Sequence, residues 1–172
     1  MLTLSLLRHA KSNWDDADLS DHERPLAKRG TKNATEMGRY IADNGLRPEL
    51  VVSSDSVRTR ATVSLMLAEL AAPPPEVIYD EKLYLARPAT LIERLRKMGQ
   101  GRSHVMLVGH NPGLHALALS LTGNGDRKAL QKMAMKFPTA ALAVIAFEGD
   151  DWAEAKPGAG TLEAFVTPRE LG

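Results

Sequence analysis

Residues 2–9 read LTLSLLRH, a short apolar run that ends in an arginine and a histidine. An apolar run of this length is typical of a strand that is buried on both faces of a parallel sheet. In open α/β sheets, ligands bind beyond the carboxyl ends of such strands. We therefore expect Arg8 and His9 to lie at the edge of the sheet where a ligand would bind.

Two later strand candidates end in similar residues. Residues 50–52 (LVV) lead through a polar segment to Arg58, and residues 104–108 (HVMLV) lead to His110. Because the carboxyl ends of parallel strands meet at one edge, we expect these side chains to join the two that follow the first strand. Guanidinium groups match phosphate oxygens, and helix N-termini add backbone donors. The pattern predicts a pocket for a phosphoryl group.

Strands and helices alternate along most of the chain. Further strands are expected at residues 77–79, in a closing hairpin of 141–147 and 151–156, and at 162–166 within a loose C-terminal segment, 157–172. Helices are expected to open at Pro25, at a cap formed by residues 53–55, at Pro88 and at Asn111-Pro112, and the glycine-rich residues 122–125 are expected only to end the last helix. This pattern predicts a three-layer α/β/α sandwich with a mainly parallel central sheet, in a single domain spanning residues 1–172.

The composition excludes several classes of protein and site. The 172 residues are 44% hydrophobic and 25% charged, with a formal net charge of +1. This balance gives no general attraction to nucleic acid or to anionic membranes. The absence of cysteine excludes disulfides, thiol nucleophiles and zinc–thiolate sites. No stretch resembles a signal peptide or a membrane-spanning helix, so a soluble cytoplasmic protein is expected, and no carboxylate cluster calls for a metal or other cofactor.

Three segments, taken in order, resemble the signature of the histidine phosphatase superfamily, which has the phosphoglycerate mutase-like fold. They are residues 7–12 (LRHAKS), residues 53–58 (SSDSVR) with Thr62, and residues 109–113 (GHNPG). The stretch 24–30 (RPLAKRG) and the small size resemble the SixA-like phosphohistidine phosphatase branch. Each segment alone is a modest signal, whereas the three in this order are fairly specific.

The resemblance implies a role for each site residue. His9 would attack phosphorus and form a covalent phosphohistidine, which water then hydrolyses. Arg8, Arg58 and His110 would hold the phosphoryl oxygens. Two further residues, Ser12 and Asn111, would bind substrate. Ser12 could instead only turn the loop, and Asn111 could instead cap a helix.

Two positions stand apart from these roles. Arg60 points about 200° away from Arg58 around the helix and is the poorer phosphate ligand. Glu81 lies where many relatives carry a general acid, but the SixA-like branch is thought to manage without one.

The expected function is metal-independent hydrolysis of phosphohistidine on a signalling or phosphocarrier protein. A small-molecule phosphomonoesterase of the same superfamily is the alternative, and a phosphoglycerate mutase is disfavoured because the chain is too short to build a closed site. A phosphoprotein-binding module without activity is an alternative of another class. Two departures from the signature bear on the site: Ala10 replaces the usual Gly, and Lys11 makes the rim more basic.

Overall fold

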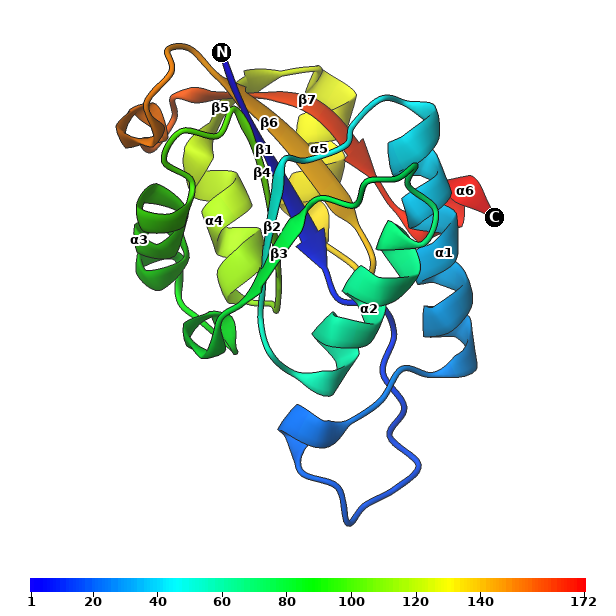
Figure 1. Ribbon diagram of the computed structural model, residues 1–172. Helices are drawn as coiled ribbons and strands as arrows, with labels where there is room; N and C mark the ends of the chain where they lie inside the picture. Colours follow the sequence, from blue (N-terminus) through cyan, green and yellow to red (C-terminus); the bar gives the residue numbers. More distant parts are fainter.

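The strand β1 (Leu2–Arg8) lies at the centre of a seven-stranded sheet, in a computed structural model that describes residues 1–172 (Figure 1). The strand order is β3-β2-β4-β1-β6-β7-β5. The other strands are β2 (Leu50–Ser53), β3 (Glu76–Tyr79), β4 (His104–Gly109), β5 (Thr122–Gly125), β6 (Leu142–Phe147) and β7 (Gly160–Val166). The α-helices are α1 (Lys28–Asp43), α2 (Val57–Leu67), α3 (Pro88–Met98), α4 (Gly113–Leu121), α5 (Arg127–Met135) and α6 (Pro168–Leu171).

The register of the parallel half of the sheet brings three strand ends together. β1 pairs in parallel with β4, with Arg8 opposite Gly109. β2 pairs in parallel with β4, with Ser53 opposite Val108. The residues that follow these strands therefore start from one edge, as predicted. On the other side of β1, β6 is antiparallel to both of its neighbours, β1 and β7, whereas β7 is parallel to the edge strand β5.

The sheet is covered on both faces, which confirms the predicted three-layer α/β/α class. α1 and α2 lie on one side, and α3 and α4 lie on the other (Figure 1). Alternate residues of each central strand face opposite layers, so Leu4 and Leu6 of β1 join the core with α3 and α4. Leu7 joins the core with α1 and α2. Both faces of these strands are apolar, which explains why they read as nearly continuous hydrophobic runs.

The C-terminal third differs most from the prediction. The expected hairpin strand at residues 151–156 is wrong, because Asp151 caps a short 3-10 helix, Trp152–Glu154. The partner of β6 is β7, an interior strand of the sheet rather than part of a loose end. Residues 122–125 do not merely end a helix but form β5, which pairs with β7. The helix α5, capped by the side chain of Asp126, was not expected.

Three helix starts also differ from the prediction. α1 begins at Lys28 rather than Pro25, because Leu26 forms an antiparallel bridge with Ser12. α2 is capped by Ser56, whose Oγ accepts the backbone N–H of Thr59. The cap of α4 is Pro112, and the side chain of Asn111 makes no cap bond. Each start is therefore displaced toward the C-terminus of the chain.

Gly30 in α1 allows the helix to lie against the loop that follows β1. A Cβ atom at this position would come within 2.1 Å of the backbone oxygen of Lys11. The backbone of Lys11 in turn lies two residues from His9. Close packing of α1 on this loop therefore requires a residue without a side chain.

Substitution Gly30→Ala is expected to destabilise the protein by about 1–2 kcal/mol, because the clash outweighs the better helix propensity of alanine. Urea unfolding measures this change. The exposed substitution Lys32→Ala in the same helix is the control and should change stability by less than about 0.5 kcal/mol. Equal stability of the two variants would contradict the packing argument.

Candidate active site

A small pocket of about 220 Å³ opens at the edge where β1, β2 and β4 end. It brings together the four predicted phosphate-site residues, Arg8, His9, Arg58 and His110. The other residues that line it are Lys11, Ser12, Trp14, Leu85, Asn111 and Thr139. Of the seven residues predicted for catalysis or substrate binding, six line this pocket. The lining contains five cationic or imidazole groups around a space large enough for a phosphoryl group.

The imidazole of His9 is held as an uncharged base with one free nitrogen. Its Nδ1 lies 2.7 Å from the carbonyl oxygen of Ala10, and since a carbonyl only accepts, Nδ1 carries the hydrogen. Burial is the main factor that lowers the pKa of His9 to about 4, with Arg58 and Arg8 adding to the effect and the Ala10 carbonyl opposing it. At neutral pH the Nε2 lone pair is therefore available to attack an electrophile.

The ring of His110 is held by two hydrogen bonds and lies beside that of His9. Its ring centroid lies 5.2 Å from that of His9. Its Nε2 lies 2.8 Å from Ser54 Oγ, and its Nδ1 lies 3.3 Å from an Arg58 nitrogen, which can only donate. Burial first, then the neighbouring His9 and Arg58, lowers the pKa of His110 to about 3. A dianionic ligand beside it would raise this pKa and favour the protonated ring.

Arg58 is oriented by residues that the sequence analysis did not single out. Its guanidinium donates to the backbone oxygen of Asp21 at 2.6 Å and to the Asp21 carboxylate at 2.9 Å. The hydroxyl of Tyr84 donates to the same carboxylate. The hydrogen bond from Tyr84 is the main cause of a lowered pKa at Asp21, and Arg58 adds to it. Asp21 begins a short 3-10 helix, Asp21–Glu23, in a stretch of chain rich in acidic residues, so no sequence signal distinguishes it.

Arg8 keeps unused hydrogen-bonding capacity. One terminal nitrogen donates to the carbonyl oxygen of Phe137 at 3.1 Å, while its buried Nε has no partner. Asn111 also donates to Phe137, at 2.8 Å, and its buried Oδ1 has no partner. Buried polar atoms are seldom left without partners, so these groups are suited to a bound ligand. The contact to Phe137 also explains why Asn111 does not cap α4.

The residues after His9 connect the first two signature segments. The Ala10 N–H donates to Thr62 Oγ1 at 3.0 Å, and this hydroxyl donates to the Arg58 carbonyl at 2.7 Å. The Ala10 methyl packs with Ala34 and Ala140 in a small buried cluster. The replacement of Gly by Ala is therefore accommodated within the core. Lys11, by contrast, lines the pocket, as expected of a more basic rim.

Glu81 does not line the pocket. It lies exposed in a short 3-10 helix, Glu81–Leu83, without an ion pair or side-chain hydrogen bond. Leu85, which follows this helix, does line the pocket and has a φ of 50°. Arg60 is directed elsewhere, as predicted, because its Nε donates to the Asp55 carbonyl and its guanidinium lies 4.0 Å from the ring of Tyr79.

No three His, Asp or Glu side chains gather in a way that could hold a metal ion. No helix combines the length and hydropathy needed to cross a bilayer.

The two buried imidazoles make stability depend on pH. Their pKa values of about 4 and about 3 in the folded state lie below the usual 6.5, so the unfolded chain binds more protons in this window. Above pH 6.5 both rings are uncharged in the folded and the unfolded chain, and protonation costs no stability. Stability is then lost as the pH falls from 6.5 toward 4 for His9 and toward 3 for His110. We expect the free energy of unfolding to fall by up to about 1.4 kcal/mol per histidine per pH unit. Urea unfolding near pH 7 and near pH 5 measures this slope.

The double variant His9→Asn/His110→Asn provides the control for this prediction, because Asn does not titrate. Its unfolding free energy should change less between the two pH values than that of the natural chain. Identical slopes would show that other groups cause the pH dependence.

Comparisons with known proteins agree with this geometry. A family model described as the histidine phosphatase superfamily, branch 1, matches residues 4–84. An uncharacterized protein of Mycobacterium tuberculosis is 36% identical over 166 residues, with 95% of this chain and 100% of the relative covered.

Solved structures extend the likeness to the whole chain. A candidate phosphohistidine phosphatase SixA from Agrobacterium tumefaciens is 28% identical and has a TM-score of 0.81, with 97% of this chain and 98% of that chain covered. The protein histidine phosphatase SixA complexed with tungstate is 21% identical and has a TM-score of 0.78, with 99% and 100% covered. At 21% identity, the similarity to the tungstate complex supports the fold alone.

Proposed function

Because this chain belongs to the histidine phosphatase superfamily, it is a phosphatase, and we propose that it hydrolyses phosphohistidine on a signalling or phosphocarrier protein. In the proposed mechanism, His9 Nε2 attacks phosphorus in line as the bond between phosphorus and the substrate imidazole breaks. The leaving imidazole takes up a proton from solvent water, since no carboxylic acid lines the pocket. Water then attacks the phosphoryl group on His9, which releases inorganic phosphate and restores the uncharged ring.

The positive groups of the pocket support this mechanism. Arg8 and Arg58 offer donors to the phosphoryl oxygens, and the free Nε–H of Arg8 is one of them. His110 would take up a proton as the dianion binds and donate from Nδ1 in place of its present contact with Arg58. These groups offset the charge that develops as the phosphoryl group is transferred. We assign Ser12 and Asn111 to substrate binding because both line the same space.

The lack of a carboxylic acid in the lining is the observation that favours phosphohistidine. No Asp or Glu lines the pocket, and Asp21, which reaches Arg58, is held ionised by its hydrogen bonds. An alkyl phosphate needs an acid to protonate its leaving oxygen. The P–N bond of a phosphoramidate breaks more readily than the P–O bond of an alkyl phosphate, and imidazole is a better leaving group than an alkoxide. The pocket is therefore better suited to a P–N bond than to a sugar or alkyl phosphate.

A parallel assay distinguishes the possible substrates. A histidine-phosphorylated phosphocarrier protein, p-nitrophenyl phosphate and a panel of sugar and nucleotide phosphates are each mixed with the protein in the presence of EDTA. We expect the phosphohistidine protein to give the highest kcat/KM. A higher value for one small phosphate would favour a small-molecule phosphomonoesterase, and loss of turnover with EDTA would contradict the metal-independent mechanism.

Trapping tests the covalent intermediate separately. Labelled substrate is mixed with the protein and quenched in base, where phosphohistidine survives. We expect acid-labile label on His9 and none on the variant His9→Ala. Rapid turnover without any such label would contradict covalent catalysis.

A further inference from the structure

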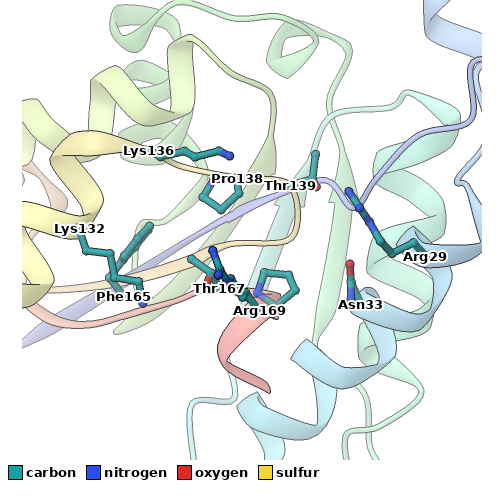
Figure 2. A pocket seen from close by; sticks show the side chains of 10 residues that line it. Arg29, Asn33, Lys132, Lys136, Pro138, Thr139, Phe165, Thr167 and Arg169 are labelled. Atoms are coloured by element: carbon teal, nitrogen blue, oxygen red, sulfur yellow. The ribbon is translucent and has the colours of Figure 1, made fainter. Parts of the chain in front are cut away.

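A basic groove lies beside the phosphate pocket and shares a wall with it. The groove has a volume of about 490 Å³, and its cations are Arg29, Lys132, Lys136 and Arg169. Figure 2 shows Lys132 on one side of the groove and Arg29, from α1, on the other. Thr139 lines both the groove and the phosphate pocket. The two spaces are therefore neighbours on one surface.

The positive charge of the groove is largely unpaired. Lys132 forms an ion pair with Glu170 and lies 5.6 Å from the centre of the Phe165 ring. Arg29, Lys136 and Arg169 are exposed and form no ion pair. No Asp or Glu lines the groove, although the whole chain has a net charge of only +1. The basic groove thus concentrates positive charge that acidic residues balance elsewhere.

The connector between α5 and β6 fixes the groove relative to the phosphate pocket. The carbonyl of Phe137 in this connector accepts hydrogen bonds from Arg8 and Asn111. The N–H of Ala140, which has a φ of 59°, donates to the carbonyls of Arg8 and His9. A ligand whose phosphoryl group enters the pocket would thus meet the groove at a fixed offset.

We propose that the basic groove binds an acidic segment of the phosphoprotein substrate, next to the phosphorylated histidine in that protein's structure. This inference rests on the proposed function and adds a specificity determinant to it. The cations come from separate elements, α1, the end of α5 and α6, and surround the opening. Positive charges spread over three elements in this way complement an acidic protein surface and speed its association.

The lining does not favour a small anionic molecule. Small-molecule sites have a few convergent polar groups in a largely enclosed cavity. Of the buried residues here, Phe165 offers no hydrogen-bond donor, and the Thr167 hydroxyl is already bonded to Glu170. Apart from Asn33 and Thr139, the recognition groups that remain are long cationic side chains, three of which are exposed. These suit a surface with several carboxylates better than a single bound phosphate.

Charge reversal in the full chain tests the proposal. The triple variant Arg29→Glu/Lys136→Glu/Arg169→Glu is compared with Lys97→Glu/Arg127→Glu/Lys128→Glu, whose three residues are exposed, unpaired and outside the groove. The probes are two synthetic peptides phosphorylated on one histidine, with several flanking residues all Glu in one and all Gln in the other. Phosphoimidazole, which is too small to reach the groove, reports on the chemistry alone.

The natural chain and the control variant should each prefer the Glu peptide by about tenfold in kcat/KM, and added salt should weaken the preference. The groove variant should lose this preference and hydrolyse phosphoimidazole at the natural rate. A preference that survives in the groove variant, or that disappears equally in the control, would overturn the proposal.

Binding of the unphosphorylated Glu peptide, measured by fluorescence anisotropy, separates this inference from the proposed function. If no phosphohistidine substrate is turned over, the proposed function fails, yet the groove variant should still bind this peptide about tenfold more weakly than the control. Equal binding by the two variants would overturn the groove proposal. A single-stranded oligonucleotide serves as a further probe. If it bound more tightly than the Glu peptide, and if the groove variant lost this binding, nucleic acid rather than an acidic protein segment would be the ligand of the groove.

Discussion

The variant His9→Ala is expected to hydrolyse p-nitrophenyl phosphate about 10⁴-fold more slowly than the natural chain, or worse. This substrate is chosen because its leaving group needs no proton, so the assay reports on the nucleophile. The other imidazole of the pocket, that of His110, does not replace it as nucleophile, since both of its ring nitrogens are engaged, with Ser54 and Arg58. Steady-state release of p-nitrophenol measures the effect.

The variant His115→Ala is the matched control for this experiment. His115 is half-buried, contacts the Met133 carbonyl and the ring of Phe137, and does not line the pocket. Its activity should stay within a few-fold of the natural rate. If His9→Ala hydrolysed p-nitrophenyl phosphate at a rate close to that of the control, the assignment of His9 as nucleophile would be wrong.

The variant Arg58→Lys should lose about 10²-fold in kcat/KM while the fold is retained. Lysine keeps the charge but not the planar fork that contacts Asp21 twice and reaches His110. The ligand would therefore meet a mobile point charge in place of a fixed pair of donors. Initial rates at low substrate concentration measure kcat/KM directly.

The variant Arg60→Lys provides the comparison two residues along the same helix. Arg60 contacts the Asp55 carbonyl and the Tyr79 ring and does not line the pocket. Its kcat/KM should change by no more than about twofold. Similar losses in the two variants would mean that the effect comes from α2 as a whole rather than from phosphate recognition.

The strand ends could be predicted because their signals are local. The apolar run before Arg8 and the run before His110 each identify a buried strand, and parallel pairing then brings the ends together. The start of α1 could not be predicted in this way. Pro25 is a good helix opener, yet the bridge between Ser12 and Leu26 holds that segment extended until Lys28. Such a contact depends on residues that become neighbours only in the folded chain.

The supporting residues of the site were missed for the same reason. Asp21 is one of several acids in its loop, and only the fold brings it to Arg58 and Tyr84. Asn111 was predicted as a site residue, but its contact with a carbonyl 26 residues away was not, because the residue reads locally as a helix cap. Sequence patterns therefore indicated which groups could carry the chemistry, whereas the residues that orient those groups required the structure.

The hydrogen bond from His9 Nδ1 to the carbonyl of Ala10 also decides the regiochemistry of the phosphoenzyme. An imidazole can in principle be phosphorylated on either nitrogen, giving two positional isomers. Here one nitrogen is occupied by the backbone of the next residue, so only the isomer phosphorylated on Nε2 can form without turning the ring. A trapped intermediate should accordingly give a single ³¹P resonance, that of the Nε2 isomer.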